Sequence, residues 1–546
     1  MGHRFLLVLA VLLLAYLSLF LKLYDLQLQN GEYYLAKAES RYLNPELLLA
    51  NRGTIYFTDK NGNSVLAALN KNFPIIYAIP MAIDDSSEAA NLLSPILGQP
   101  VESLLAKFSK KDDTYEPLVK KADLLVAEKV NDLKIKGVYV EALPHRFYSF
   151  GNLASQVLGF VGPSSETLHE EGRYGLEAFY ENILAGKPGS LDNNKIVPPA
   201  TGEDLRLTID LNIQTEAERI LSNLVKNYKA TGGTVIVEEP RTGKILAFGN
   251  LPNFDPNNYS EFELGRFLNP GVQSIYEPGS VLKVITMAAG IDSGKITPDT
   301  TYVDTGSLTF GDREIRNYDL KVYGRSSMTE VIEHSINTGA AFAEKQTGHL
   351  VFKNYLEKFG FGEKTGIDLP GEVRGDLRRL YPNAPPIVFA TASFGQGVAV
   401  TPTELINAIS SIANKGKLMR PYLNANLEPQ VLRTVIRGET AREVAQMMVS
   451  AIDKNEIAKI SGYSIAGKTG TAQVPDFKNG GYTDRVVNTY VGFGPATNPR
   501  FVILIKLDEP AHAPAAAITV VPAFRDLAQF ILNYLNIPPD RLTTSN

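Results

Sequence analysis

The apolar run over residues 5–21 constrains this chain more than any other feature. At about 1.5 Å per residue, a helix of this length nearly crosses the hydrocarbon core of a bilayer. Arg4 and Lys22 flank the run and can reach the polar surfaces at its two ends. No small residues suited to peptidase cleavage follow it, so we expect a retained transmembrane anchor over residues 5–25. Residues 1–4 would be a cytoplasmic stub, with the remaining chain outside the cytoplasm.

Composition excludes several classes of function. The 54 Lys and Arg residues against 59 Asp and Glu residues give a formal net charge of −5, which offers no attraction for a nucleic-acid backbone. The absence of cysteine excludes disulfides, thiolate metal sites, iron–sulfur clusters and thiol nucleophiles. The six histidines are scattered and lack His-Glu-x-x-His spacing. We therefore expect no metal, no cofactor and no nucleic-acid partner.

A passage rich in glycine, proline and asparagine, residues 186–202, is typical of a linker between two domains. It places the boundary near residue 202. The expected organisation is a mixed N-terminal domain over residues 26–201, a second domain over residues 202–540 and a tail over residues 541–546.

The second domain has predicted strands at both ends of its sequence and helical segments between them. The predicted elements are a strand over 205–209, a helix over 212–228, a hairpin of 234–237 with 245–248, strands over 489–493 and 501–507, and a helix over 522–535. This order predicts an α+β fold, in which an antiparallel sheet is closed by the two ends of the domain around a helical insert.

Ser280 and Lys283 have the spacing on which the predicted chemistry depends. Ser-x-x-Lys occurs once in the chain, at the start of a predicted apolar helix, so the two side chains share one face. A lysine desolvated among aliphatic residues can lose its proton and become the base that activates a serine. The helix N-terminus favours a developing oxyanion. The structural alternative is a capping serine beside a surface lysine, and the apolar neighbours of Lys283 argue against it.

The chain's only Ser-x-Asn tripeptide, Ser335-Ile336-Asn337, follows. The Ser335 hydroxyl could relay a proton, and the Asn337 amide could hold a peptide group of a substrate. A loop with Asn-Thr-Gly turn chemistry is the alternative for this segment.

Lys-Thr-Gly occurs twice, at residues 364–366 and 468–470. The first copy lies in a predicted loop, and we assign it no catalytic role. The second lies in an extended segment that continues through Thr471. There, Gly470 would let a ligand backbone approach a strand edge, and Lys468 with the Thr469 hydroxyl would bind a carboxylate.

The ordered trio of motifs resembles the signature of penicillin-binding proteins and class A β-lactamases. The chain as a whole resembles the class B penicillin-binding proteins, the monofunctional peptidoglycan transpeptidases. The segments that carry this likeness are Arg52–Ile55, Asp59–Gly62, Tyr174–Glu177, Leu184–Gly186, Leu207–Asp210 with Gln214, Tyr276–Ser280, Gly395–Gly397 and Thr401–Pro402. Lys60 stands where the family usually has Arg, and Ile336 is larger than the usual residue. On this likeness, residues 26–201 form the pedestal (dimerisation-type) domain and residues 202–540 form the transpeptidase domain, with a helical subdomain.

The resemblance implies a serine acyl-enzyme mechanism. Ser280 would attack the carbonyl of the penultimate D-Ala of a peptidoglycan stem peptide, release the terminal D-Ala, and pass the acyl chain to an amine of a neighbouring stem. Lys283 would deprotonate Ser280. Ser335 and Asn337 would shuttle the leaving-group proton and orient the peptide. β-Lactams would acylate Ser280 and leave slowly.

The resemblance also implies substrate contacts. Lys468, Thr469 and Gly470 would hold the terminal carboxylate of the stem peptide. The backbone N–H groups of Ser280 and Thr471 would form the oxyanion hole.

The resemblance further implies partners and a location. These are a SEDS-family glycan polymerase, other cell-division membrane proteins and the bacterial cytoplasmic membrane, which the chain would cross once with its catalytic domain outside. The segments Thr489–Pro495 and Asp508–Pro510 are more similar to the septal type than to the elongation type. The short interval between Ser335 and Lys468 favours the same type.

Four alternatives stay open from the sequence. An elongation-type transpeptidase would have the same motifs, and a D,D-carboxypeptidase would use the same acyl-enzyme with water as acceptor. A β-lactamase needs a carboxylate to activate the deacylating water, and Glu404 is the nearest candidate. A non-catalytic division scaffold would not need the intact Ser280 and Lys283. His334, beside Ser335, is assigned a structural role because no carboxylate is placed in sequence to orient it.

Overall fold

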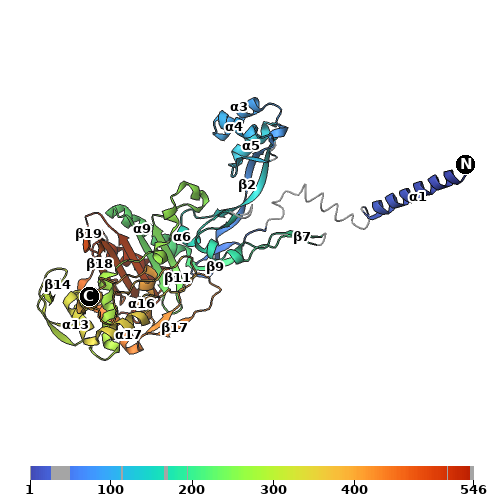
Figure 1. Ribbon diagram of the computed structural model, residues 1–546. Coiled ribbons are helices and arrows are strands. Elements are labelled where there is room, and N and C mark those ends of the chain that lie inside the picture. Colours follow the sequence, from blue (N-terminus) through green and yellow to red (C-terminus); the bar gives the residue numbers. More distant parts are fainter. Residues whose placement is uncertain are drawn as a thin grey trace. The chain divides into compact units, whose positions relative to one another are not determined.

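Figure 1 shows the computed structural model of the chain, which describes residues 2–25, 27, 50–111, 113, 115–164, 170–192, 195–476, 478–512 and 514–541. α1 (Gly2–Tyr24) covers most of the segment for which a membrane anchor is predicted. Among the residues so described, no helix is both long enough and apolar enough to cross a membrane. Of the tail expected over residues 541–546, only Arg541 falls within the described residues.

The chain forms two compact units, and each unit is made of segments that alternate along the sequence. The smaller unit consists of residues 1–54, 68–149 and 182–204, and the larger one consists of residues 55–67, 150–181 and 205–546. Two segments that precede the expected boundary thus pack with the larger unit. One reason is that β1 (Ile55–Thr58) pairs in parallel with β9 (Leu205–Asp210). Another is that the Phe160 ring stacks on the Tyr259 ring with their centroids 4.3 Å apart.

A five-stranded antiparallel sheet, in the order β11-β10-β20-β19-β18, is the centre of the larger unit. β10 (Gly232–Glu239) and β11 (Lys244–Leu251) come from near the start of the unit's long C-terminal segment. Three strands come from near its end: β18 (Ala466–Pro475), β19 (Tyr482–Gly494) and β20 (Phe501–Asp508). In Figure 1, β11 in green lies in the same sheet as β18 and β19 in red. The predicted closure of the sheet by the two ends of the domain is therefore confirmed.

Helices cover both faces of this sheet. α9 (Leu211–Tyr228) and α18 (Val520–Tyr534) pack on one face, where their apolar side chains and alternate strand residues form one core cluster. Val502 and Leu504 of β20 point to the other face and are fully buried. α16 (Pro402–Ala413), which is buried over its whole length, contacts the sheet there.

The region between β11 and β18 is mostly helical, as predicted. α11 (Leu282–Asp292) is buried from Leu282 to Ile291 and is packed against α13, α14 and α17, so the predicted nucleophile Ser280 lies just before a helix that is almost wholly enclosed. The elements of the region between β11 and β18 are η4 (Pro256–Glu261), η5 (Leu264–Phe267), α10 (Pro270–Gln273), η6 (Gly279–Val281), α11, β12 (Thr301–Asp304), β13 (Ser307–Phe310), β14 (Arg313–Arg316), β15 (Gly324–Ser327), α12 (Met328–Glu333), α13 (Asn337–Thr347), α14 (His349–Lys358), α15 (Pro386–Ala392), α16, β16 (Lys417–Met419), β17 (Val431–Thr434) and α17 (Gly438–Asn455).

The remaining elements of the larger unit are short. They are α6 (Ser155–Leu158), β5 (Val161–Pro163), β6 (Glu170–Gly172) and α7 (Gly175–Phe179), with α8 (Glu181–Leu184) at the change to the smaller unit.

β2 (Ser64–Ala78), which belongs to the smaller unit from Ala68 onward, pairs along most of its length with β4 (Val138–Tyr148), and its end pairs with β3 (Glu116–Val119). Three helices pack on these strands around a common apolar core: α3 (Ser86–Leu97), α4 (Val101–Phe108) and α5 (Leu124–Asp132). A short 3-10 turn, η3 (Pro80–Ala82), follows β2.

The passage predicted as the linker between two domains contains a small hairpin. β7 (Ser190–Asp192) and β8 (Lys195–Val197) pair in antiparallel fashion. Lys187 and Ala200, which flank the two strands in sequence, form an isolated β-bridge. Glycine, proline and asparagine mark hairpin turns as well as linkers, so composition alone did not predict these two strands.

Candidate active site

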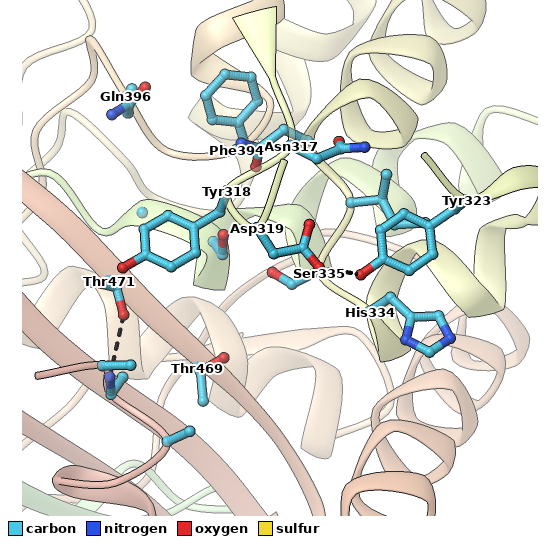
Figure 2. Close-up of a pocket in the computed structure, with 17 residues that line it drawn as sticks. Asn317, Tyr318, Asp319, Tyr323, His334, Ser335, Phe394, Gln396, Thr469 and Thr471 are labelled. Atoms are coloured by element: carbon cyan, nitrogen blue, oxygen red, sulfur yellow. Dashed lines mark hydrogen bonds between the residues drawn. The ribbon is translucent and has the colours of Figure 1, made fainter. Parts of the chain in front are cut away.

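A cavity of about 220 Å³ opens in the larger unit beside η6, the start of α13 and β18. Figure 2 shows the side chains around it, with Ser335 near the centre and Thr469 and Thr471 on the strand to one side. The lining residues are Gly279, Ser280, residues 317–319, Tyr323, residues 334–337, Phe394, Gln396, Thr469, Thr471 and residues 515–517. Of the eight predicted site residues, Ser280, Ser335, Asn337, Thr469 and Thr471 line the cavity directly.

Ser280 lies in the turn η6, directly before α11. Gly470 sets how closely β18 approaches this turn, because a Cβ atom built on Gly470 would lie 2.5 Å from the Pro278 carbonyl oxygen and 3.1 Å from Val281 Cγ2. The sequence predicts that this glycine makes room for a ligand backbone. In the structure, the position of that Cβ atom is taken by the segment before Ser280, so Gly470 is also required for the fit of the strand against the nucleophile turn.

Lys283 is fully buried one turn further along. Its ammonium nitrogen donates to the Ser335 carbonyl oxygen and to Ser335 Oγ, the latter at 3.1 Å. Burial lowers the pKa of Lys283 well below its ordinary value, and the nearby Lys468 lowers it further, while Asp319 acts in the opposite direction. A lysine in this environment releases its proton more readily than an exposed lysine, and in its neutral form it can accept a proton from a nearby hydroxyl.

Both lysines of the site converge on Ser335. Lys468 Nζ donates to Ser335 Oγ at 2.9 Å, opposite the contact from Lys283. Ser335 has a φ angle of +58°, a left-handed conformation that non-glycine residues adopt mainly where the surroundings enforce it. The hydroxyl oxygen is thus shared by two amines, which gives protons one short path among the three groups.

Lys468 is 4% exposed, and burial lowers its pKa to about 7. It lies on β18, opposite Val491 of β19, and its Nζ also lies 3.1 Å from the Thr469 carbonyl oxygen and 3.4 Å from Thr469 Oγ1. About half of the molecules carry the charge at neutral pH. A carboxylate brought into the cavity would stabilise the charged form, because an opposite charge nearby raises the pKa of an amine.

Asn337 and Thr471 complete the predicted set. Asn337 is the first residue of α13, and its side-chain nitrogen donates to the Arg316 carbonyl oxygen at 2.9 Å while the residue lines the cavity. Thr471 lies on β18, where its hydroxyl oxygen accepts from the Ala516 N–H at 3.3 Å. The structure therefore brings three motifs that are far apart in sequence around one cavity.

Two other sequence features lie away from this cavity. The first Lys-Thr-Gly copy, residues 364–366, has an exposed lysine, and it is not among the lining residues. Glu404 is buried at the start of α16, where its carboxylate accepts from the N–H groups of Thr401, Gly362 and Gly375. Burial raises the pKa of Glu404 to about 7. This carboxylate has a structural role and does not face the space beside Ser280.

Several lining residues were not predicted as site residues. They come from the loop over residues 317–323, from His334, from Phe394 and Gln396, and from residues 515–517. Gln396 lies within a Gly-Gln-Gly segment that the sequence singles out. The loop contains no sequence motif. It connects β14 to β15, directly before α12, and this position in the fold brings it to the cavity. Across the described ranges, no group of three or more acidic or histidine side chains is placed to hold a metal ion.

Two family models match the chain. The penicillin-binding protein transpeptidase domain matches residues 233–529, and the penicillin-binding protein dimerisation domain matches residues 48–196. Stage V sporulation protein D of Bacillus subtilis is 31% identical over 93% of this chain and 82% of the relative. The probable peptidoglycan D,D-transpeptidase PenA of Neisseria gonorrhoeae is 31% identical over 95% of this chain and 91% of the relative.

A solved structure is similar over nearly the whole chain. The crystal structure of penicillin-binding protein 3 from Mycobacterium tuberculosis, complexed with aztreonam, is 25% identical, with a TM-score of 0.70 over 90% of this chain and 98% of that chain. With both family domains matched in this order, and with relatives at this identity aligned along almost their full length, the chain belongs to the class B penicillin-binding proteins.

Proposed function

We propose that the chain is a peptidoglycan D,D-transpeptidase that works through an acyl-enzyme on Ser280. The observation that carries the proposal is the convergence of two buried lysines on Ser335 Oγ, beside the cavity that Ser280 lines. The name of the Neisseria relative, a probable peptidoglycan D,D-transpeptidase, supports the same reaction.

In the first half-reaction, neutral Lys283 takes the proton from Ser280 Oγ as the oxygen attacks the carbonyl of the penultimate D-Ala. The C–N bond to the terminal D-Ala then breaks, and the leaving nitrogen receives the proton through Ser335 Oγ. Burial supports this role for Lys283, because it lowers the pKa of the amine and so favours the neutral form that can accept a proton.

In the second half-reaction, an amine of a neighbouring stem peptide attacks the Ser280 ester. The attacking amine gives a proton to neutral Lys283, the C–O bond of the ester breaks, and Lys283 returns that proton to Ser280 Oγ. Aminolysis thus restores the starting state and leaves a cross-link between two stems.

Substrate recognition uses the β18 side of the cavity. Lys468 and Thr469, with Gly470 setting the path of the strand, bind the terminal carboxylate of the donor stem. Asn337 holds a peptide group of the donor. The N–H groups of Ser280 and Thr471 bind the oxyanion that forms during attack.

The decisive experiment is intact-protein mass spectrometry of the full chain after incubation with a penicillin. We expect a stable adduct of one β-lactam on the parent protein and none on Ser280→Ala. The matched control is Ser274→Ala, an exposed serine in the segment just before the site, which should be labelled like the parent. Full labelling of Ser280→Ala would refute the assignment of the nucleophile.

The contacts of Glu404 favour a transpeptidase over a β-lactamase. Its carboxylate accepts from the backbone N–H groups of Gly362, Gly375 and Thr401, and its own N–H donates to the Thr401 hydroxyl in the helix cap. Glu404 is not among the residues that line the cavity, so it is not placed to activate a water beside Ser280, and we expect the penicillin adduct to persist rather than to turn over.

We further propose a septal role and a membrane location. The septal role rests on the sequence likeness of Thr489–Pro495 and on the short interval between Ser335 and Lys468. The location rests on the apolar run over residues 5–21, which would hold the chain in the bacterial cytoplasmic membrane beside a SEDS-family polymerase and other division proteins. Fractionation of the full chain against a variant lacking residues 2–25 tests the location, and a soluble full chain would contradict it.

A further inference from the structure

The loop over residues 317–323 brings a carboxylate to the wall of the cavity. Asp319 is the one acidic side chain among the described lining residues, and it lines the same space as Ser280 and Ser335. Figure 2 shows Asp319 between the rings of Tyr318 and Tyr323, with Thr469 and Thr471 on the strand to the other side. The cavity therefore has the hydroxyl groups of Thr469 and Thr471 on the β18 side, and a negative charge on the loop side.

The Asp319 carboxylate is held in place and is charged. Asp319 Oδ2 accepts from the Tyr323 hydroxyl at 2.7 Å, and Oδ1 accepts from the Lys321 N–H at 3.2 Å. Burial raises the pKa of Asp319, but these hydrogen bonds and the Lys321 ammonium outweigh it and leave the pKa below its ordinary value. Lys321 Nζ is 3.4 Å away on a side chain that is 70% exposed, so this pair is weak and easily exchanged for another cation.

Both ends of the loop are fixed to a buried anchor. The Asp304 carboxylate, which is 1% exposed, accepts from Asn317 Nδ2 at 2.9 Å and from the Tyr323 N–H at 2.8 Å. It also accepts from the Thr338 hydroxyl in the first turn of α13 at 2.6 Å. The loop is thereby tied to the helix that begins at Asn337, so Asp319 keeps its position relative to the site without a ligand.

Tyr323 is fixed on its other side as well. Its ring stacks on the His334 ring, with centroids 5.1 Å apart and an interplanar angle of 27°. His334 directly precedes Ser335. The hydroxyl that orients the Asp319 carboxylate is therefore itself held by a residue of the catalytic segment.

The two substrates of the proposed reaction differ in charge at their reacting ends. The donor stem presents a carboxylate, which suits Lys468. The acceptor stem presents an amino group, which is mostly protonated at neutral pH and needs a negative partner to leave bulk water. We propose that Asp319, oriented by Tyr323, is the subsite that receives the ammonium group of the acceptor stem peptide. This inference rests on the transpeptidase function proposed above and adds the recognition of the second substrate.

The role is one of binding. Asp319 holds the amine in its protonated form near the Ser280 ester, and the amine loses one proton to solvent before it attacks. Removing the charge should therefore raise the KM for the acceptor, and should leave the formation of the acyl-enzyme intact. If Asp319 acted instead by shifting the pKa of Lys283, its removal would change the rate of acylation itself.

The test compares Asp319→Asn with the parent, using the full chain acylated by a D-alanyl thioester donor. Nα-acetyl-lysine amide serves as the cationic acceptor, and hydroxylamine serves as an acceptor that is uncharged at neutral pH. We expect Asp319→Asn to raise the KM for the lysine acceptor about tenfold, with hydroxylamine capture, ester hydrolysis and penicillin acylation unchanged. Asp319→Glu, which keeps the charge, should recover most of the loss.

Asp312→Asn is the matched control, because Asp312 is an exposed carboxylate in the nearby turn between β13 and β14 and does not line the cavity. It should behave like the parent. An unchanged KM for the lysine acceptor in Asp319→Asn would overturn the subsite, and so would an equal loss with hydroxylamine or with penicillin. A parent protein that forms no acyl-enzyme at all would instead refute the proposed function.

Discussion

The two Lys-Thr-Gly segments have the same sequence and share none of their contacts. At residues 468–470, the lysine is buried on β18 and donates to Ser335 Oγ. At residues 364–366, the lysine is exposed, while the threonine N–H and hydroxyl both donate to the carboxylate of Glu372. The tripeptide therefore has no chemistry of its own. Burial of the lysine and a strand edge beside a cavity make one copy a candidate binding site, and a neighbouring glutamate makes the other a fixed turn.

The largest expected difference between the copies is at the lysines. Lys468→Ala should reduce the rate of acylation by a penicillin about a hundredfold, because it removes both the charge for the carboxylate and a donor to Ser335 Oγ. Lys364→Ala should leave that rate unchanged. Stopped-flow measurement of acylation on both variants checks this, and equal rates would mean that the site does not use the buried copy.

The glycines should differ next. Gly470→Ala forces a Cβ atom to within 2.5 Å of the Pro278 carbonyl oxygen, so β18 must move away from the turn that carries Ser280, and we expect acylation to slow about tenfold. Gly366 has a φ angle of +77° with its nearest neighbour, Arg420 Nε, 3.6 Å from a built Cβ. Gly366→Ala should therefore lower the melting temperature without slowing acylation. Thermal unfolding and acylation of the two variants separate the effects.

A smaller effect is expected on the pH dependence. The pKa of Lys468 is lowered to about 7 by burial, so the charged form is present below that pH and is lost as the pH rises through it. Acylation by a carboxylate-bearing penicillin should then fall about fivefold between pH 7 and pH 8. Lys468→Arg keeps its charge over this range and should remove the fall, even if its overall rate is lower. A parent profile that stays flat there would show that the charge on Lys468 is not needed.

Much of the larger unit is readable from the sequence because its elements have clear periodicity. The alternating and apolar runs predict β10, β11, β19 and β20, and the helical spacing predicts α9 and α18 within a few residues. The three motifs could be placed in order as well, because the spacing of Ser280 and Lys283 and the apolar neighbours of the lysine have direct physical meaning.

Other features depend on contacts that periodicity does not encode. β1 joins the larger unit only because it pairs with β9, far along the chain. A Cβ atom on Gly470 would meet the Pro278 carbonyl oxygen, which follows from the packing of β18 on η6. Asp319 reaches the cavity because Asp304, a buried residue of a different strand, fixes the loop.

The pairing of β10 with β20 also determines when the central sheet can form during synthesis of the chain. Gly232 lies opposite Asp508 and Glu238 lies opposite Val502, so a strand made early by the ribosome has no partner on that side until one of the last segments has emerged. The whole helical insert, with Ser280 and Ser335, is synthesised during this interval. Long-range pairing of this kind is slow and leaves strand edges exposed meanwhile. A chain that stops before Phe501 would therefore contain every predicted catalytic side chain and still lack the sheet that holds them together.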